Sequence, residues 1–422
     1  MPSKSFEKSI PDCPPRKIRL LAVFNECREV TTPFENVLHV DPERFDIHVL
    51  SLSQSPEDIA RTLSDLRDNP GQSTPVVTLH GAPAPHRLSW NPWRTARLLR
   101  RLNPDIIHLH HCGSGFLLAL LARLLTRAAV ITTVHSNYTR YRRRQKGMLL
   151  LVYKLSDAIV CNSQNTLDAI GPIRRRFFPH TPAVVIHNGV NLPFLSQTYL
   201  RPPSAPQSDA PYRIGTIGRL VPAKDHPTLL KAFVRFQQYV PRSQLVLVGD
   251  GPWREKLQRL ARAWHIDQKV TFCGALPRSR TYEQLTRFDL FVMSSRWEGF
   301  GNAMVEAMLT RVPVLASRID PLPEVLGENH GLFFTVGDPK DLSRKLYYAY
   351  THPSEMTQKA QSAYRFAAQR YSLTQSARQY EQWYEAIVQR QVSPRPGPPA
   401  PDYVRKITHS SPAPVAVVKL TS

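Results

Sequence analysis

Residues 297–309 of this 422-residue chain read WEGFGNAMVEAML. The segment follows a short apolar run, and Gly299 and Gly301 let backbone N–H groups approach a ligand closely. We predict that Asn302 caps a short helix that begins at Ala303. The N-terminus of such a helix has free N–H groups and the positive end of the helix dipole. The segment therefore predicts a seat for a diphosphate.

The carboxylate of Glu306 lies on the same predicted helix, among small and apolar residues. A carboxylate in such surroundings is unfavourable unless it finds a partner. Sugar or ribose hydroxyls would satisfy it, because a carboxylate can accept two hydroxyl donors. A structural salt bridge or pairing with the helix dipole is the alternative explanation.

A second polar segment follows the apolar run Arg213–Ile217. Residues 218–225 read GRLVPAKD, so Arg219 and Lys224 are spaced five apart across a turn at the end of a predicted strand. A guanidinium fork and an ammonium point charge could bracket a diphosphate. A solvated basic loop is the alternative.

Short apolar runs alternate with helical stretches along most of the chain. The runs are rich in Val and Ile and lack strict alternation, as expected for strands of a parallel sheet covered on both faces. This pattern predicts an α/β protein with two doubly wound, Rossmann-like units in tandem. The predicted strands are Ile18–Phe24, Phe45–Leu50, Val76–Leu79, Asp105–His110, Val130–Val134, Ala158–Cys161, Val184–His187, Arg213–Ile217, Leu245–Val248, Val270–Phe272, Leu290–Met293, Val314–Ala316 and Leu332–Thr335.

Prolines divide the chain between and beyond these units. We predict a flexible leader (1–16), an N-terminal Rossmann-like unit (17–191), a linker (192–212), a C-terminal Rossmann-like unit (213–371), a terminal helix that packs back on the N-terminal unit (372–392) and a disordered Pro-rich tail (393–422). Ligands of open α/β sheets bind beyond the carboxyl ends of the strands. The two units should therefore face one another across a cleft that holds the site.

The composition narrows the class of protein. Lys and Arg number 55 against 33 Asp and Glu, for a net charge of +22, which predicts an anionic partner: nucleic acid, an acidic membrane or phosphorylated small molecules. Five scattered cysteines without a Cys-x-x-Cys motif fit a reducing cytosol. No signal peptide is visible. The apolar stretch Phe116–Val134 contains Arg123 and Arg127, so we predict a buried helix and a strand rather than a membrane span.

In combination these motifs resemble the retaining glycosyltransferases of family 4 (glycosyl transferases group 1), which have the GT-B fold. The resemblance covers roughly residues 212–371 and rests on Glu298 and Glu306 with seven residues between them, and on the Arg219 and Lys224 pair. Further matches are residues 248–252, Phe272-x-Gly274, residues 313–317 and Glu324-Val325, and, more weakly, residues 105–108, 133–135, 161–163 and 186–191.

The resemblance implies roles for individual residues. Arg219 and Lys224 would hold the donor diphosphate and stabilise its charge on departure. Glu306 would bind the ribose hydroxyls, Glu298 would contact the transferred sugar, and His135 would lie near that sugar across the cleft. The other implied donor-binding residues are Gly249, Gly251, Phe300, Gly301, Asn302 and Ala303, and the implied acceptor-side residues are Asn25, His110 and Asn162. No metal or other cofactor is implied, and the chain has no Asp-x-Asp motif.

Two segments depart from the family pattern. The family has a Gly-Gly loop after its first strand, whereas residues 24–29 contain no glycine. A Gly-Gly before the Glu324 position is replaced by residues 320–323, DPLP. The absence of glycine from residues 24–29 concerns the acceptor side of the implied site, and the change at residues 320–323 concerns its donor side. A separate cluster of His108, His110 and His111 suits a cleft lining or a core better than a metal site, because no Cys or carboxylate stands at ligand spacing.

Basic clusters mark the surface of the N-terminal unit. Residues 138–146 read YTRYRRRQK, and residues 174–178 read RRRFF. Basic residues beside aromatic ones suit acidic lipid headgroups, and a solvated surface without a partner is the alternative. The residues of the predicted membrane surface are Arg140, Arg142, Arg143, Arg144 and Lys146.

We therefore expect a cytoplasmic enzyme, peripheral on the inner face of the membrane. It would move a sugar with retention from a nucleotide-diphosphate sugar to a lipid-linked, polysaccharide or lipopolysaccharide acceptor, and it would not bind nucleic acid. Two alternatives stay open at this point. One is another GT-B activity such as that of a nucleotide-sugar epimerase, and the other is a basic nucleic-acid-binding protein.

Overall fold

A computed structural model of the chain describes most of residues 16–392. The described ranges are 16–24, 32–52, 77–80, 91–110, 115–136, 141–191 and 210–392, with the single residues Gln54, Ile59, Tyr138 and Leu195. Asn25, His111 and Arg140 lie outside the described residues, as do the loop that lacks the family's glycines, the predicted tail and nearly all of the predicted leader and linker.

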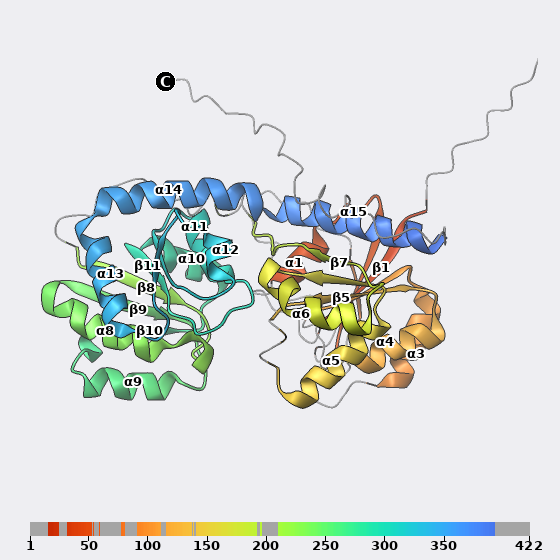
Figure 1. The fold of residues 1–422 in the computed structure, drawn as a ribbon, viewed down its shortest axis with the longest axis horizontal. Coiled ribbons are helices and arrows are strands. Elements are labelled where there is room, and N and C mark those ends of the chain that lie inside the picture. Colours follow the sequence, from red (N-terminus) through yellow and green to blue (C-terminus); the bar gives the residue numbers. More distant parts are fainter. Residues whose placement is uncertain are drawn as a thin grey trace, which may run out of the picture.

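The N-terminal unit is built on a seven-stranded parallel sheet of order β3-β2-β1-β4-β5-β6-β7 (Figure 1). Its strands are β1 (Ile18–Phe24), β2 (Phe45–Ser51), β3 (Val77–His80), β4 (Ile106–Leu109), β5 (Ala129–Val134), β6 (Ala158–Cys161) and β7 (Ala183–Val185). Its helices are α1 (Thr32–Leu38), α3 (Pro92–Leu102), α4 (Gly115–Leu125), α5 (Arg143–Leu155) and α6 (Gln164–Phe177).

The C-terminal unit repeats this plan with a six-stranded parallel sheet of order β10-β9-β8-β11-β12-β13. Its strands are β8 (Tyr212–Ile217), β9 (Ser243–Val248), β10 (Val270–Gly274), β11 (Leu290–Met293), β12 (Val314–Ser317) and β13 (Leu332–Phe334). Its helices are η2 (Pro222–Lys224), α8 (His226–Tyr239), α9 (Arg254–Ala263), η3 (Asp267–Lys269), α10 (Arg278–Thr286), α11 (Asn302–Leu309), α12 (Leu322–Leu326), α13 (Pro339–Thr351) and α14 (Pro353–Arg370).

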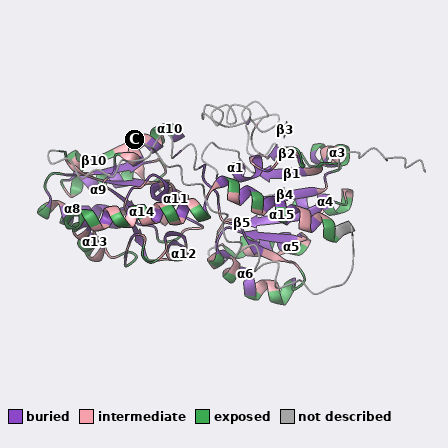
Figure 2. Ribbon diagram, turned by 90° about the horizontal axis from the view of Figure 1, so that it is seen from above, coloured by how far each residue is buried: buried purple, intermediate pink, exposed green. Residues whose placement is uncertain are grey.

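The strands are buried on both faces, as their near-continuous apolar sequences predict. Figure 2 shows the strands buried between helices whose outer faces are exposed. All the predicted strands are present, with ends that move by a residue or two. The α/β fold class with two doubly wound sheets is therefore confirmed. The apolar stretch Phe116–Val134 forms most of α4 and then β5, and no helix of the described residues is long and apolar enough to cross a membrane.

The chain returns to the N-terminal unit through α15 (Leu373–Val392), the last helix of the residues that the structure describes. Figure 1 shows α14 lying over the C-terminal unit and α15 continuing over the N-terminal one. Backbone hydrogen bonds fix the crossing, since Val190 N donates to Tyr371 O and Leu373 N donates to Val190 O. On the N-terminal side α15 buries Tyr380, Trp383, Tyr384 and Ile387 in the core. Burying large apolar side chains stabilises a fold by about 1.5–3 kcal/mol each, so α15 is firmly attached.

Candidate active site

The order of each sheet predicts where a ligand would bind. In the C-terminal sheet β8 lies between β9 and β11, so the crossovers leave β8 and β11 in opposite directions and their following loops part at this point. Two hydrogen bonds join the loops: Arg296 N donates to Ala223 O (2.8 Å) and Ser294 Oγ donates to Lys224 O (2.8 Å). The predicted donor-binding residues are concentrated in these two loops and in the helix that follows.

Lys224 and Glu298 form an ion pair between the two loops. The Glu298 carboxylate also accepts a hydrogen bond from the hydroxyl of Ser295 (2.6 Å), which is fully buried. The side chains of Lys224 and Glu298 are 23% and 11% exposed, so the lysine keeps more of its surface open to solvent than the glutamate does. The ion pair therefore fixes a cation at the carboxyl end of β8, where it could also meet the anion of a ligand.

Arg219 follows Gly218, whose backbone lies against the Lys224 side chain, and Arg219 itself is exposed and, within the described part of the chain, without an ion-pair partner. Glycines bring the neighbouring loops into contact. A Cβ on Gly249 would come within 2.0 Å of Gly218 O, and one on Gly251 within 2.6 Å of Leu220 O. Both have positive φ, 131° and 159°. Gly249 and Gly251 therefore let the loop after β9 close against the Arg219 loop.

The loop after β11 leads directly into α11. Gly301 occupies the N-cap position with φ of 94°, in the left-handed region. The prediction that Asn302 caps a helix starting at Ala303 is wrong, because Asn302 is itself the first helical residue. Its side-chain oxygen instead accepts a hydrogen bond from Asn188 Nδ2 (3.0 Å), which belongs to the N-terminal unit. Ala303 is half-buried on the first turn, close to the helix N-terminus.

Glu306 lies one turn further along α11 and is half-buried. Its carboxylate accepts a hydrogen bond from Tyr282 Oη (3.2 Å). Burial raises the pKa of Glu306, against the opposing effects of the nearby Arg278 cation and of the hydrogen bond from Tyr282. The carboxylate therefore has a hydroxyl partner already, and the chemistry of that partner matches a ribose hydroxyl.

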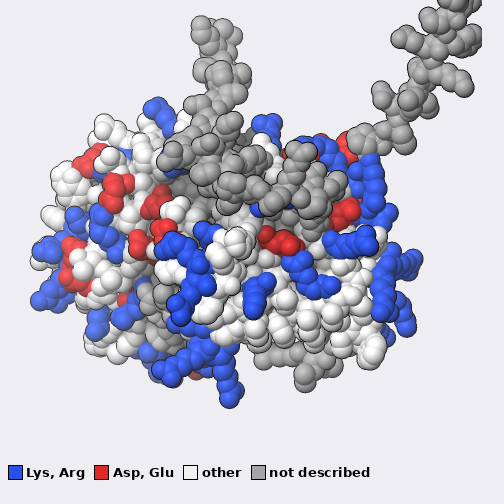
Figure 3. All heavy atoms as spheres, turned by 45° about the vertical axis from the view of Figure 1, so that its right-hand side comes forward, with Lys and Arg blue, Asp and Glu red and all other residues white. Residues whose placement is uncertain are grey.

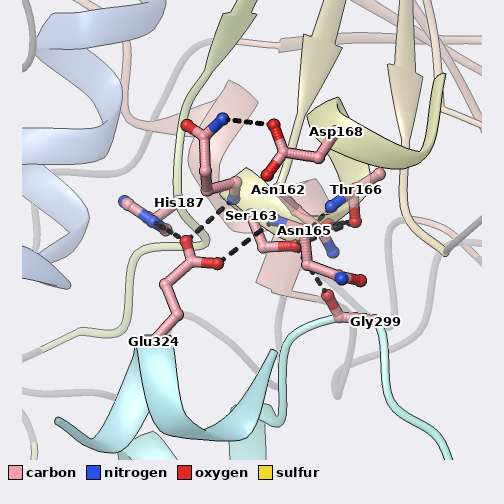
Figure 4. A network of polar contacts seen from close by, with 9 residues as sticks. Asn162, Ser163, Asn165, Thr166, Asp168, His187, Gly299 and Glu324 are labelled. Carbon is pink, nitrogen blue, oxygen red and sulfur yellow. Dashed lines mark hydrogen bonds and ion pairs between the residues drawn. The ribbon is translucent and has the colours of Figure 1, made fainter. Parts of the chain in front are cut away.

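The N-terminal unit contacts this site at Gly299. A Cβ on Gly299 would come within 2.0 Å of His135 O, so the two backbones touch where only glycine fits. Asn162 Nδ2 donates to the same His135 oxygen (3.2 Å), and Ser163 Oγ donates to Gly299 O (3.4 Å). Figure 4 shows Gly299 beside Ser163 and Asn162, the two residues that join β6 to α6. His135 thus lies across the interface from Glu298, one residue from the point of contact.

Glu324, from α12, forms a second polar contact between the units (Figure 4). Its carboxylate accepts hydrogen bonds from Gln164 N (2.8 Å) and Asn165 N (3.3 Å) at the N-terminus of α6, and from His187 Nε2 (3.1 Å). Burial alone would raise the pKa of Glu324, but these hydrogen bonds outweigh it and hold the pKa below its usual value. A carboxylate at a helix N-terminus also interacts favourably with the helix dipole.

Phe300 and the acceptor-side residues are more buried than the sequence suggests. Phe300 is 3% exposed and packs against the rings of His187 and Tyr371. His110 is wholly buried, with its ring stacked on that of Phe24, and Asn162 is 2% exposed. In this structure the side chains of His110 and Asn162 therefore support the site from within, and their place on the acceptor side stays a prediction.

His108 also belongs to the core. Its ring nitrogens form hydrogen bonds with Tyr384 Oη (2.7 Å) and Thr133 Oγ1 (2.6 Å). Burial, together with the charge of His135, lowers the pKa of His108 to about 3. The described residues contain no group of three or more His, Cys, Asp or Glu that could hold a metal ion. The structure shows that His108 and His110 are part of the core.

Several residues of the site carry no recognisable signal in the sequence. Ser295 holds Glu298, and Arg278 forms an ion pair with Glu35 on α1. The spacing of Arg278 and Tyr282, one helical turn apart, is the only local sign of their contact. The partnership of Arg278 with Glu35 joins residues 243 positions apart, which no local pattern predicts.

Comparison with known proteins places both units in described families. Residues 202–366 match the family model Glycosyl transferases group 1, and residues 39–194 match the model Glycosyltransferase Family 4. Among solved structures, HepE of Anabaena in complex with UDP and glucose superposes with a TM-score of 0.72 at 17% identity, covering 87% of this chain and 100% of that one. A likeness at this level of identity concerns the fold.

Curated relatives match over parts of the chain. The chain is 24% identical over 258 residues to the N-acetyl-alpha-D-glucosaminyl L-malate synthase of Bacillus anthracis, covering 58% of this chain and 65% of that protein. It is 26% identical over 291 residues to the alpha-monoglucosyldiacylglycerol synthase of Acholeplasma laidlawii, covering 63% and 71%. The chain spans less than two thirds of the length of several curated relatives, the Bacillus protein among them.

Proposed function

The chain belongs to the family 4, group 1 glycosyltransferases of GT-B fold, and from this membership we propose that it moves a sugar, with retention, from a nucleotide-diphosphate sugar to a glycan or lipid-linked acceptor. The observation that carries the proposal is the pair of cations at the carboxyl end of β8. Lys224 is held in place by Glu298, and Arg219 is exposed in the same loop. Two cations at a topological switch point fit a ligand with two phosphates.

The ion pair of Lys224 and Glu298 suggests how the donor is received. Before the donor binds, Glu298 neutralises and orients the ammonium. A diphosphate would offer Lys224 a second anionic partner and leave the carboxylate free to accept a hydrogen bond from the sugar. Lys224 and Arg219 would then stabilise the charge that develops on the leaving diphosphate.

The acceptor would approach from the N-terminal unit. His135 lies beside the contact between the units, and we propose that its side chain borders the transferred sugar. In the retaining reaction that we propose, the acceptor oxygen forms the new bond to the sugar on the face that the diphosphate leaves, and the acceptor proton passes to the departing phosphate oxygen. No metal or other cofactor enters this scheme, and activity in the presence of a chelator is the expected result.

The surface of the N-terminal unit supports a lipid-linked acceptor. Figure 3 shows Lys and Arg gathered along the right-hand and lower edges of the face it displays. Arg142, Arg143 and Arg144 are exposed at the start of α5. Cations are disfavoured at a helix N-terminus, so the arrangement does not serve the stability of α5. By contrast, the Arg174–Arg176 cluster ends α6, where cations are favoured.

Exposed apolar side chains accompany these cations. α3 packs against α4, and α4 against α5, so the three helices form one surface. Its exposed apolar side chains are Trp93, Leu117, Leu124, Met148 and Leu151. Apolar side chains among basic ones are the composition of a surface that binds anionic lipid. We therefore extend the predicted membrane surface from the Arg142–Lys146 segment to the outer faces of α3, α4 and α5.

The proposed reaction can be tested with the purified chain and a panel of nucleotide-diphosphate sugars. Release of nucleoside diphosphate, with transfer of label to an extracted lipid or glycan, is the expected result, and the anomeric configuration of the product by NMR tests retention. A labelled sugar that changes configuration without forming a glycosidic product would identify an epimerase instead. Salt-sensitive binding to duplex DNA, stronger than binding to anionic vesicles, would favour a nucleic-acid-binding protein.

A further inference from the structure

A chain of polar contacts leads from Glu306 to the N-terminal unit. Tyr282 Oη donates to Glu306 Oε1 (3.2 Å), and Arg278 Nε donates to the same Tyr282 oxygen (2.6 Å). The other edge of the guanidinium faces Glu35 on α1, with an ion pair from Nη1 and a hydrogen bond from Nη2 to Oε2 (3.2 Å). The contacts therefore run from α11 through α10 to α1, and they cross from one unit to the other.

The centre of this chain is buried. The side chains of Arg278 and Glu35 are 9% and 5% exposed, and Tyr282 is 1% exposed. A charge in such surroundings is tolerated only when its partners satisfy it. One edge of the planar Arg278 guanidinium contacts the Glu35 carboxylate, and its Nε donates a hydrogen bond to Tyr282 Oη. The guanidinium carbon also lies 5.5 Å from the centre of the Tyr282 ring. An ammonium could not make these contacts at once.

Arg278 also acts on the charge of Glu306. Burial raises the pKa of Glu306, and the nearby Arg278 cation opposes that effect. The ionised carboxylate acts as an acceptor at both oxygens, whereas the protonated form turns one of them into a donor, so the ionised form is the one that would bind two ribose hydroxyls. The contact with Tyr282 fixes where the carboxylate points. Position and charge of Glu306 thus depend on one guanidinium, which is itself anchored by the other unit.

We propose that Arg278 is a positioning residue that holds Tyr282 and Glu306 ready for the ribose of the nucleotide and ties this recognition to contact between the two units through Glu35. The inference rests on the proposed function, since it assigns Glu306 to the ribose. It goes further in naming Arg278, Tyr282 and Glu35 as determinants of specificity for a ribonucleotide.

The test compares the affinity of a nucleoside diphosphate with that of its 2′-deoxy form. UDP, GDP and ADP are titrated against the full chain by calorimetry, and the tightest ligand is then paired with its 2′-deoxy analogue. The wild type should prefer the ribose form by roughly tenfold or more, the effect of losing a hydrogen bond to a charged group. In Arg278→Gln and Tyr282→Phe the ratio should fall toward one.

The matched control lies on the same helix. Arg280 forms an exposed ion pair with Glu283, one turn along α10, so Arg280→Gln should leave the ratio unchanged. Because Arg278→Gln leaves Glu35 buried without its partner, that variant is vulnerable to misfolding. Tyr282→Phe removes a single hydroxyl and keeps the test decisive. A ribose preference that persists in a folded Tyr282→Phe and in Arg278→Lys would overturn the proposal.

A second comparison isolates the contribution of the N-terminal unit. Glu35→Gln and Glu324→Gln each weaken one polar contact between the units, but only Glu35 touches Arg278. Glu35→Gln should lower the ratio, whereas Glu324→Gln should weaken both nucleotides equally. If the ratio of ribose to 2′-deoxy affinity is the same in the two variants, Glu35 does not contribute to recognition of the ribose. A wild type that binds none of the nucleoside diphosphates would refute the proposed function itself, a result distinct from unchanged ratios in the variants.

Discussion

Lys224 and Glu298 are 74 positions apart in the chain, yet their side chains form an ion pair at the carboxyl ends of β8 and β11. The buried hydroxyl of Ser295 holds the carboxylate in this position. The pair depends on two loops that separate at the switch point of the sheet and are then rejoined by backbone contacts. The ion pair fixes the position of the Lys224 ammonium, whereas a surface lysine without a partner would be mobile.

Replacing Lys224 by Met should reduce kcat/KM for the nucleotide sugar by about a hundredfold to a thousandfold, the usual effect of losing one group that stabilises developing negative charge. Steady-state kinetics with the best donor of the panel measures this. Lys359 on α14 forms an ion pair with Glu355 one turn before it on the same helix, so Lys359→Met is the matched control. Equal losses in both variants would show that the effect does not come from the site.

Glu306 and Glu298 should respond differently to loss of charge. Glu306→Gln is expected to weaken nucleoside diphosphate binding by roughly tenfold to a hundredfold, because a hydrogen bond to a charged acceptor is lost. Glu298→Gln should leave that affinity nearly unchanged and lower kcat, because its proposed partner is the transferred sugar. Calorimetry and kinetics on the two variants separate these effects. Wild-type nucleotide affinity in Glu306→Gln would refute its assignment to the ribose.

Gly299 should tolerate no side chain while the units are in contact. A Cβ there would lie 2.0 Å from His135 O, a backbone atom of the other unit, so Gly299→Ala must push the units apart. We expect a strong loss of transfer activity with a largely preserved melting temperature. Gly147→Ala is the control: a Cβ at this exposed helical position meets nothing within 4 Å, and alanine should stabilise α5 by about 0.5–1 kcal/mol. Full activity in Gly299→Ala would show that catalysis does not require this contact.

The fold could be predicted from the sequence because buried parallel strands have a local signature. Runs such as Leu290–Met293 are apolar on both faces, and their order along the chain already implies two doubly wound sheets. The start of α11 was mispredicted for a local reason as well. Asn302 is a favourable capping residue by type, but Gly301 adopts a positive φ and takes the N-cap position. Residue type alone does not reveal which of two neighbours leaves the helical conformation.

The candidate site was predictable only where its residues follow strands. Arg219, Lys224 and Glu298 stand after β8 and β11, where ligands bind in such sheets. Arg278 and Glu35 have no such position, and each would pass for a solvated residue of an amphipathic helix. Their burial depends on how the two units meet, which is information carried by neither segment alone. The same holds for Glu324, whose helix-capping partner is α6 of the other unit.

The basic and apolar surface of α3, α4 and α5 should bind anionic vesicles. Leu124 and Leu151 are 70% and 48% exposed, so Leu124→Asp with Leu151→Asp should abolish cosedimentation with vesicles of phosphatidylglycerol and leave the fold intact. Arg143→Glu with Arg144→Glu should weaken binding and reduce its dependence on salt. Tyr239→Asp, at an exposed aromatic residue of the C-terminal unit, is the control. Binding that survives both N-terminal double variants would exclude this surface.

His108 should make the chain sensitive to acid. Its pKa in the fold is about 3, below the 6.5 of an ordinary histidine, because burial disfavours the charged ring. As the pH falls from 6.5 toward 3 the unfolded chain binds a proton that the folded chain does not, so stability is present above this window and is lost through it. Each such histidine contributes a slope of about 1.4 kcal/mol per pH unit.

His108→Gln should therefore flatten the dependence of the unfolding free energy on pH in this window, measured by urea denaturation, even if it lowers stability at neutral pH by disturbing the contacts with Tyr384 and Thr133. The half-buried His39 and the buried His226 also have pKa values lowered by burial to about 4, so part of the slope should remain. A slope in His108→Gln equal to that of the wild type would mean that the buried ring titrates alike in both states.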